Sequence, residues 1–143
     1  MKAVLGIMAG IIFVVYSVYF VRIIKGEPQV FEMEMLKSLA AWMIERGRAS
    51  KTQLWLMYFL SLLLELVYFI LSFYLLTNPV LRFVTAAFMG VEVYHMSMIA
   101  VYFRRFFAGK TMISQLFNWP LERVSATFFF THSFLVLVSL IIF

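Results

Sequence analysis

The sequence predicts an all-α membrane protein: a bundle of four transmembrane helices with one cytoplasmic interfacial amphipathic helix. Of its 143 residues, 64% are hydrophobic and only 13% are charged, about half the charged share of soluble domains. The mean hydropathy is +0.97. The apolar residues form four blocks, each close to the roughly 20 residues that cross a hydrocarbon core. These blocks leave no room for a soluble domain, so residues 1–143 are predicted to form a single membrane domain.

The first predicted span covers residues 4–24 and lies close to the N-terminus. It is longer than the apolar region of a typical signal peptide, and Arg22 and Pro28 follow without a small-residue cleavage pattern. We therefore expect the span to be retained as a helix. Gly6 and Gly10 have the spacing that lets another helix approach closely, either within the chain or across a dimer.

Residues 31–46 are predicted to form an amphipathic helix that lies on the cytoplasmic leaflet. Polar residues recur at intervals of roughly 3.5 residues, the apolar residues lie on the other side, and a tryptophan suits the membrane interface. The polar side contains Glu34, Lys37, Ser38, Glu45 and Arg48, and the apolar side Phe31, Met35, Leu39, Trp42 and Met43. The same pattern fits a helix that docks onto a soluble partner.

The remaining spans are predicted at residues 53–76, 80–103 and 124–143. A short connection ending in Pro79 joins the second span to the third, so these two helices should be antiparallel neighbours. Glu122 precedes the fourth span, where a negative charge is favoured by the dipole of the helix N-terminus.

The connections predict the orientation of the chain, because cytoplasmic loops carry an excess of Lys and Arg. Basic residues gather between the first and second spans and between the third and fourth. They are Arg22, Lys25, Lys37, Arg46, Arg48 and Lys51 in the former, and Arg104, Arg105, Lys110 and Arg123 in the latter. Both connections are therefore predicted to be cytoplasmic, with both termini outside. The net charge of +5 is then explained by attraction of the basic connections to an anionic cytoplasmic leaflet. No nucleic-acid partner is expected.

The candidate functional residues are four ionisable side chains within the spans: Glu65, Glu92, His95 and His132. Each lies near the middle of its span, so all four are predicted to approach the bilayer midplane. On the second span they are supported by a polar stripe at heptad spacing. The stripe consists of Tyr58, Ser61, Tyr68 and Ser72. Because ionisable residues inside a membrane are costly to retain, they indicate a functional site.

Three chemistries fit this cluster. Paired glutamates and histidines can bind and release a proton or a divalent cation. The same four residues form a candidate metal site for Zn, Mn or Fe, and the Glu92-x-x-His95 spacing occurs in dimetal helix bundles, although a complete site would need a second copy. Haem b ligation by His95 and His132 is the third. A purely structural network of interhelical hydrogen bonds is the alternative to all three.

The sequence favours a non-enzymatic function, because it has no cysteine or aspartate from which to build a nucleophile–base–orienter set. Its size, basic charge and outward termini resemble the small four-helix membrane enzymes of glutathione and eicosanoid metabolism. The arginine- and asparagine-bearing motif of their second helix is absent here, so the resemblance concerns topology alone.

The leading hypothesis is a small ion-handling channel, transporter or transporter subunit. The alternatives are a metalloprotein or haem-binding redox subunit, and an assembly or scaffold subunit of a membrane complex that acts through residues 31–46. Four helices leave little room for a pathway, so we expect a homo-oligomer or a subunit of a larger complex.

Overall fold

The computed structural model describes all 143 residues and consists of helices joined by short connections. The helices are α1 (Lys2–Ile24), α2 (Pro28–Arg46), α3 (Ala49–Leu75), α4 (Pro79–Phe107), the 3₁₀ helix η1 (Ile113–Gln115) and α5 (Trp119–Ile142). Four of them, α1, α3, α4 and α5, are long and apolar enough to cross a membrane. The predicted bundle of four transmembrane helices is therefore confirmed.

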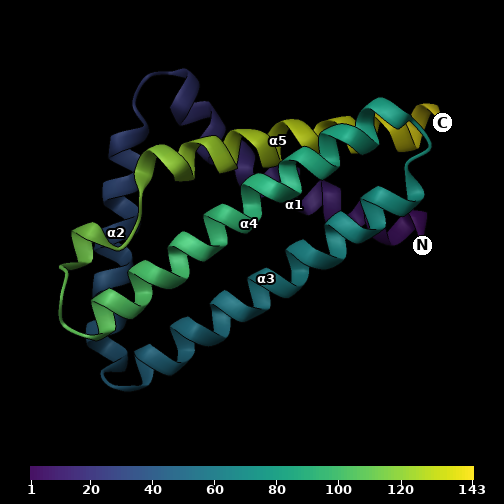
Figure 1. Cartoon of the computed structure of the whole chain (residues 1–143). Coiled ribbons are helices and arrows are strands. Elements are labelled where there is room, and N and C mark those ends of the chain that lie inside the picture. The colour runs from purple at the N-terminus through teal and green to yellow at the C-terminus, as the bar shows by residue number, and fades with distance from the viewer.

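The long helices run up and down, so that both termini and the α3–α4 turn lie at one end of the bundle (Figure 1). Helix α2, η1 and the longer connections lie at the other end. There α2 runs across the ends of the long helices rather than alongside them (Figure 1). All the basic connections described above therefore share one end of the molecule.

All four spanning helices begin earlier than their predicted apolar blocks, and asparagine caps fix the start of two of them. Helix α4 starts at Pro79 because the Asn78 side chain accepts hydrogen bonds from the Val80 and Leu81 amides, at 2.9 and 3.2 Å, and proline is well tolerated in a first helical turn. Helix α5 starts at Trp119 in the same way, after the cap Asn118. Polar residues that precede the fourth apolar block consequently belong to the first turn of α5.

Helices α1 and α5 make the most extensive contact between any two helices of the bundle. Leu5 and Ala9 on α1 are fully buried, and a Cβ atom added at Gly6 would lie 3.8 Å from Leu140 Cδ1 of α5. A Cβ added at Gly10 would meet nothing within 4 Å. Only the first glycine of the predicted packing motif is thus turned toward another helix of this chain.

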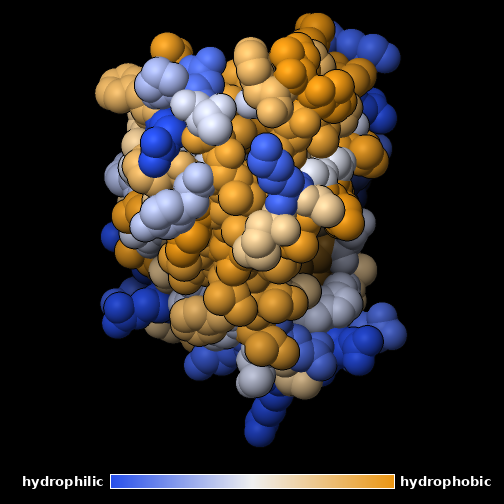
Figure 2. Space-filling view, turned by 90° about the vertical axis from the view of Figure 1, so that its right-hand side faces the viewer, coloured by the Kyte–Doolittle hydropathy of each residue, from blue (hydrophilic) through white to orange (hydrophobic).

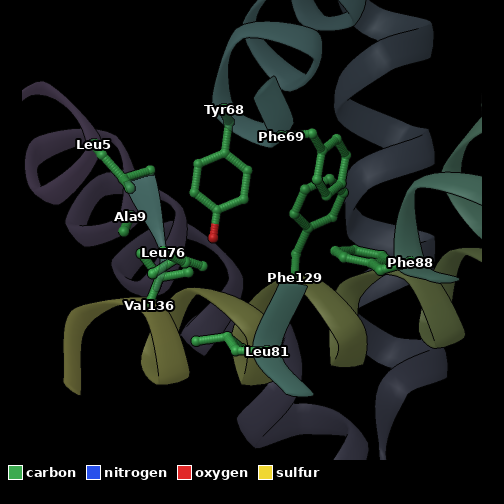
Figure 3. Close-up of a cluster of buried hydrophobic side chains, with 9 residues drawn as sticks. All are labelled: Leu5, Ala9, Tyr68, Phe69, Leu76, Leu81, Phe88, Phe129 and Val136. Carbon is green, nitrogen blue, oxygen red and sulfur yellow. The ribbon is translucent and has the colours of Figure 1, made fainter. Parts of the chain in front are cut away.

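The apolar core lies toward the end that carries the termini. Figure 3 shows Phe69, Phe88 and Phe129, from α3, α4 and α5, grouped together, with Tyr68 beside them directing its hydroxyl toward α5. The Phe88 ring meets the other two phenylalanine rings face to edge. Leu5 and Ala9 of α1 complete this cluster. Its aromatic rings fill much of the space between the helices, and the polar contact between Tyr68 and His132 lies among them.

Much of the outer surface is apolar, as expected for helices surrounded by lipid. Side chains such as Val14, Leu63, Phe83 and Val93 are more than half exposed, although a soluble protein would bury them. Viewed from the side where the termini lie, hydrophobic residues cover most of the face, and hydrophilic residues lie along its lower edge and at several places in its upper half (Figure 2). These features identify an integral multi-pass membrane protein.

Candidate functional site

Helices α4 and α5 are antiparallel and pair their polar residues in one consistent register. Three side-chain hydrogen bonds join them: Thr85 to His132, Glu92 to Ser125 and His95 to Glu122. In each pair the two residue numbers add up to 217. The heptad and i, i+3 spacings within α4 are therefore matched by the same spacings within α5.

His95 lies between two carboxylates. Its Nδ1 is 2.9 Å from Glu92 Oε2 and its Nε2 is 2.9 Å from Glu122 Oε1. Ser125 donates to the other oxygen of Glu92, at 2.7 Å. Glu92 and His95 are almost fully buried, and Glu122 leaves 19% of its side chain exposed. Because Glu92 and His95 are one turn apart on α4, Glu122 closes a triad that joins two spanning helices.

The number of protons in this triad of Glu92, His95 and Glu122 follows from its two nitrogen–oxygen contacts. Each nitrogen–oxygen contact needs one proton, but a neutral imidazole carries only one N–H. The triad therefore contains either an imidazolium between two carboxylates or a neutral His95 with one protonated carboxyl group. In both cases it stores two shared protons and a net charge of −1. Loss of one proton breaks one of the two bonds.

Glu65 of α3 faces the same site across a cavity of about 240 Å³. The polar residues that line this cavity, called the carboxylate cavity below, are Tyr16, Tyr58, Ser61, Glu65, His95 and Glu122. Glu65 is half-buried and has no hydrogen bond to another group of the protein. Three helices thus direct one unpaired and two paired carboxylates toward one region of the bundle, and Tyr16 adds a phenol from α1.

The structure does not bring His132 to these carboxylates. Tyr68 lies 2.8 Å from His132 Nδ1, and Thr85 Oγ1 lies 2.7 Å from Nε2. Thr85 also donates to the Leu81 carbonyl at 2.8 Å, so its hydroxyl accepts the Nε2 proton and Tyr68 donates to Nδ1. This network is complete with a neutral imidazole. Seven residues separate it from the triad along α4, about 10 Å of helix.

The predicted polar stripe of α3 is divided between these two regions. Tyr58 donates to the Met96 carbonyl of α4, at 2.9 Å, and Ser61 lines the carboxylate cavity. Tyr68 belongs to the His132 network. Ser72 is fully buried, and its hydroxyl has no hydrogen-bond partner. The stripe therefore marks the inner face of α3, but it does not surround a single site.

A partly buried ion pair that was not predicted from the sequence lies beside the triad. Arg123 binds Glu32 of α2 through two hydrogen bonds, Nε to Oε2 and Nη2 to Oε1, both 2.7 Å long. The Tyr19 hydroxyl also donates to Glu32. Burial raises the pKa of Glu32, but the hydrogen bonds from Arg123 and Tyr19 outweigh it and hold that pKa below its usual value. The pair anchors α2 to the first turn of α5.

The metal and haem hypotheses gain no support from this geometry. No group of three or more His, Cys, Asp or Glu side chains is arranged so that it could hold a metal ion. Both ring nitrogens of His95 and of His132 face protein partners, whereas axial ligation of haem needs a free nitrogen. Comparisons of this chain with protein-family models, with curated proteins and with solved structures found no match.

Proposed function

We propose that this protein is a proton-handling transporter or transporter subunit, and that Glu65, Glu92, His95 and Glu122 form its proton-binding site. One observation carries the proposal: His95 bridges two carboxylates from two spanning helices, while a third carboxylate faces the same cavity without a partner. Such an arrangement can take up or lose a proton by rearranging hydrogen bonds among groups that are already in contact.

The charges around the site favour a cation over an anion. No lysine or arginine lines the carboxylate cavity, and the nearby Arg123 is occupied by Glu32. A carboxylate within the hydrocarbon core costs at least about 2.5–3.5 kcal/mol, so three of them need protons or cations to offset that cost. The unpaired Glu65 is the group that we expect to exchange its proton most freely.

We further propose that the end carrying α2 faces the cytoplasm. All the basic connections lie at this end (Figure 1), and the other end contains only Lys2 and Arg82. The positive-inside rule then places both termini outside. In this orientation the first turn of α5, with Glu122, lies on the cytoplasmic side of the bundle.

Proton flux into liposomes tests the proposal. The full-length protein is reconstituted with a trapped pH-sensitive dye, and a potassium diffusion potential drives protons inward. Wild-type protein should acidify the lumen, and Glu65→Gln should lose most of this flux because its amide cannot exchange a proton. Glu34→Gln is the matched control, since Glu34 is an exposed glutamate of α2 and its loss should leave the flux unchanged.

Infrared titration of the same samples shows the protonation directly. Histidines and paired carboxylates exchange protons between about pH 8 and about pH 5. As the pH is lowered through this range, wild-type protein should gain a carboxylic-acid band, and Glu65→Gln should diminish that band. A Glu65→Gln variant that retains both the wild-type flux and the full band would refute the proposed site, and so would wild-type protein that shows neither signal.

A further inference from the structure

A second cavity, of about 260 Å³, also has Glu122 in its lining. Its lining is unusually aromatic. The aromatic residues are Tyr16, Tyr19, Phe31, Phe117 and Trp119. They come from α1, α2, α5 and the connection before α5, so this aromatic cavity lies where α2 crosses the end of the bundle. Glu122 and Ser125 are its polar lining residues besides the tyrosines.

The aromatic cavity and the carboxylate cavity share three residues: Tyr16, Phe117 and Glu122. Glu122 therefore contributes to both. Its Oε1 atom is bonded to His95, and its Oε2 atom has no hydrogen-bond partner in the protein. One carboxylate thus belongs to the proton-binding triad while its second oxygen remains available to a ligand.

No lysine or arginine side chain binds Oε2 of Glu122. Arg123 is the next residue, but it extends toward α2 and forms its two hydrogen bonds with Glu32. The Tyr19 hydroxyl binds Glu32 as well, and its ring stacks on Phe31, so the Tyr19 hydroxyl is not available to a ligand. No lysine or arginine lines the aromatic cavity. The chemistry offered to a ligand is therefore aromatic rings together with one carboxylate.

Aromatic rings around a negative charge are the recognition chemistry of organic cations, because the ring faces attract an ammonium group and quaternary ammonium groups are bound by aromatic cages. We propose that the aromatic cavity binds a small organic cation with a quaternary or alkylated ammonium group. This cation would be the transported substrate or a regulatory ligand of the proton-handling protein. This inference rests on the proposed function. The ammonium group would lie among the rings of Tyr16, Phe117 and Trp119 and face Oε2 of Glu122.

Such a ligand and the proton would compete. The protonated triad carries a net charge of −1, and a cation beside Glu122 stabilises the form that has lost one more proton, with a charge of −2. Binding should therefore release a proton to the solvent, leaving the combined charge of triad and ligand at −1. This exchange at a single carboxylate is the simplest coupling of a cation to a proton.

Binding of benzyltrimethylammonium to the full-length protein in a maltoside detergent tests the inference by calorimetry. The titration is repeated in two buffers that differ in ionisation enthalpy, which gives the number of protons released. We expect saturable binding, release of up to about one proton per ligand, and weaker binding at lower pH. Neopentylbenzene has the same shape without the charge, and it should not displace the bound cation.

Two variants locate the site. Glu122→Gln keeps a hydrogen-bonding group near His95 and should weaken binding by about tenfold or more. Trp119→Leu should weaken it by about threefold to thirtyfold, the range of a cation–aromatic contact. Trp42→Leu and Glu34→Gln are the controls, since neither residue lines either cavity, and both should bind as wild type does.

The ammonium group could belong to a free solute or to the choline headgroup of a lipid. Binding of benzyltrimethylammonium in phosphatidylglycerol nanodiscs is therefore compared with binding in nanodiscs that also contain phosphatidylcholine. Equal affinity in both identifies the free cation as the ligand, whereas competition by phosphatidylcholine identifies the headgroup. Both results support the aromatic cavity as an ammonium site.

Three results would overturn the inference: no saturable binding, equal displacement by the neutral compound, or unchanged affinity in both Glu122→Gln and Trp119→Leu. The proposed function fails separately. If the Glu65→Gln effects on flux and infrared titration hold while the cation does not bind, the proton site stands and only the substrate is wrong. If the cation binds without proton release, the proposed coupling between cation binding and deprotonation of the triad is refuted.

Discussion

The ion pair between Glu32 and Arg123 makes the attachment of α2 to the bundle measurable. Replacing Glu32 by Gln removes the negative charge but keeps the shape and one acceptor. Arg123 therefore retains at most one hydrogen bond, to a neutral acceptor, in place of two hydrogen bonds to a carboxylate. Breaking a fully buried pair costs about 3–5 kcal/mol. Glu32 is 5% exposed but Arg123 is 30% exposed, so water compensates part of the loss. We expect a destabilisation of about 1–3 kcal/mol.

The pH dependence of this effect has a definite sign. The pKa of Glu32 in the folded protein is lower than its ordinary value of 4.5, so the folded state favours the ionised carboxylate. Its contribution to stability is fully present above pH 4.5 and is lost as the pH falls through the folded-state pKa. The difference in stability between wild type and Glu32→Gln should therefore be constant near neutral pH and shrink in acid.

A double-mutant cycle isolates the pair. Unfolding free energies are measured in mixed micelles, as the fraction of a denaturing detergent rises, for wild type, Glu32→Gln, Arg123→Gln and the double variant. The structure predicts a coupling energy of about 1–2 kcal/mol at neutral pH. Coupling within about 0.3 kcal/mol of zero, or coupling that grows as the pH falls below 4.5, would show that the ion pair does not anchor α2.

Further predictions concern the packing of the bundle, and all are read from the same unfolding assay. Tyr68→Phe leaves His132 Nδ1 without a donor in a buried site and should cost about 1–3 kcal/mol; an unchanged stability would contradict the neutral network. Gly6→Ile should cost about 1–3 kcal/mol by overpacking, whereas Gly10→Ile should be nearly neutral, since a Cβ there meets nothing within 4 Å; equal effects would contradict the α1–α5 packing. Asn78→Ala should cost about 0.5–2 kcal/mol through loss of its cap, and a smaller change would mean that the α3–α4 turn holds without it.

The helices could be predicted because their signal is local. Each span is an uninterrupted apolar block, and the bilayer sets its length. The errors occur at the ends, where polar residues such as Glu122 and Arg123 continue a helix beyond its apolar block. Capping by Asn118 fixes that boundary, and an asparagine before Trp-Pro is a signal that the sequence analysis could have used.

The composition of the site was less predictable, because spacing within one helix says nothing about register between helices. Glu92 and His95 share a face at i, i+3, and they are indeed in contact. If the α4–α5 connection were a symmetric turn between Phe107 and Trp119, His95 would face Thr131. It faces Glu122, nine residues earlier, because the packing of the two helices sets their offset, and the long connection with η1 accommodates it. Only the packed structure supplies that offset.

The register that joins α4 to α5 also determines where this chain can tolerate changes in length. The pairs between the helices depend on side-chain spacing inside each helix, not on the number of residues in the connection that contains η1. Residues inserted beside the exposed Gly109 and Lys110 should leave every pair intact, whereas Leu116, later in the same connection, is fully buried and packs with the bundle. One residue inserted between Thr85 and Glu92 would instead turn the rest of α4 by about 100° and separate His95 from Glu122, even though the helix and its hydrophobicity were preserved.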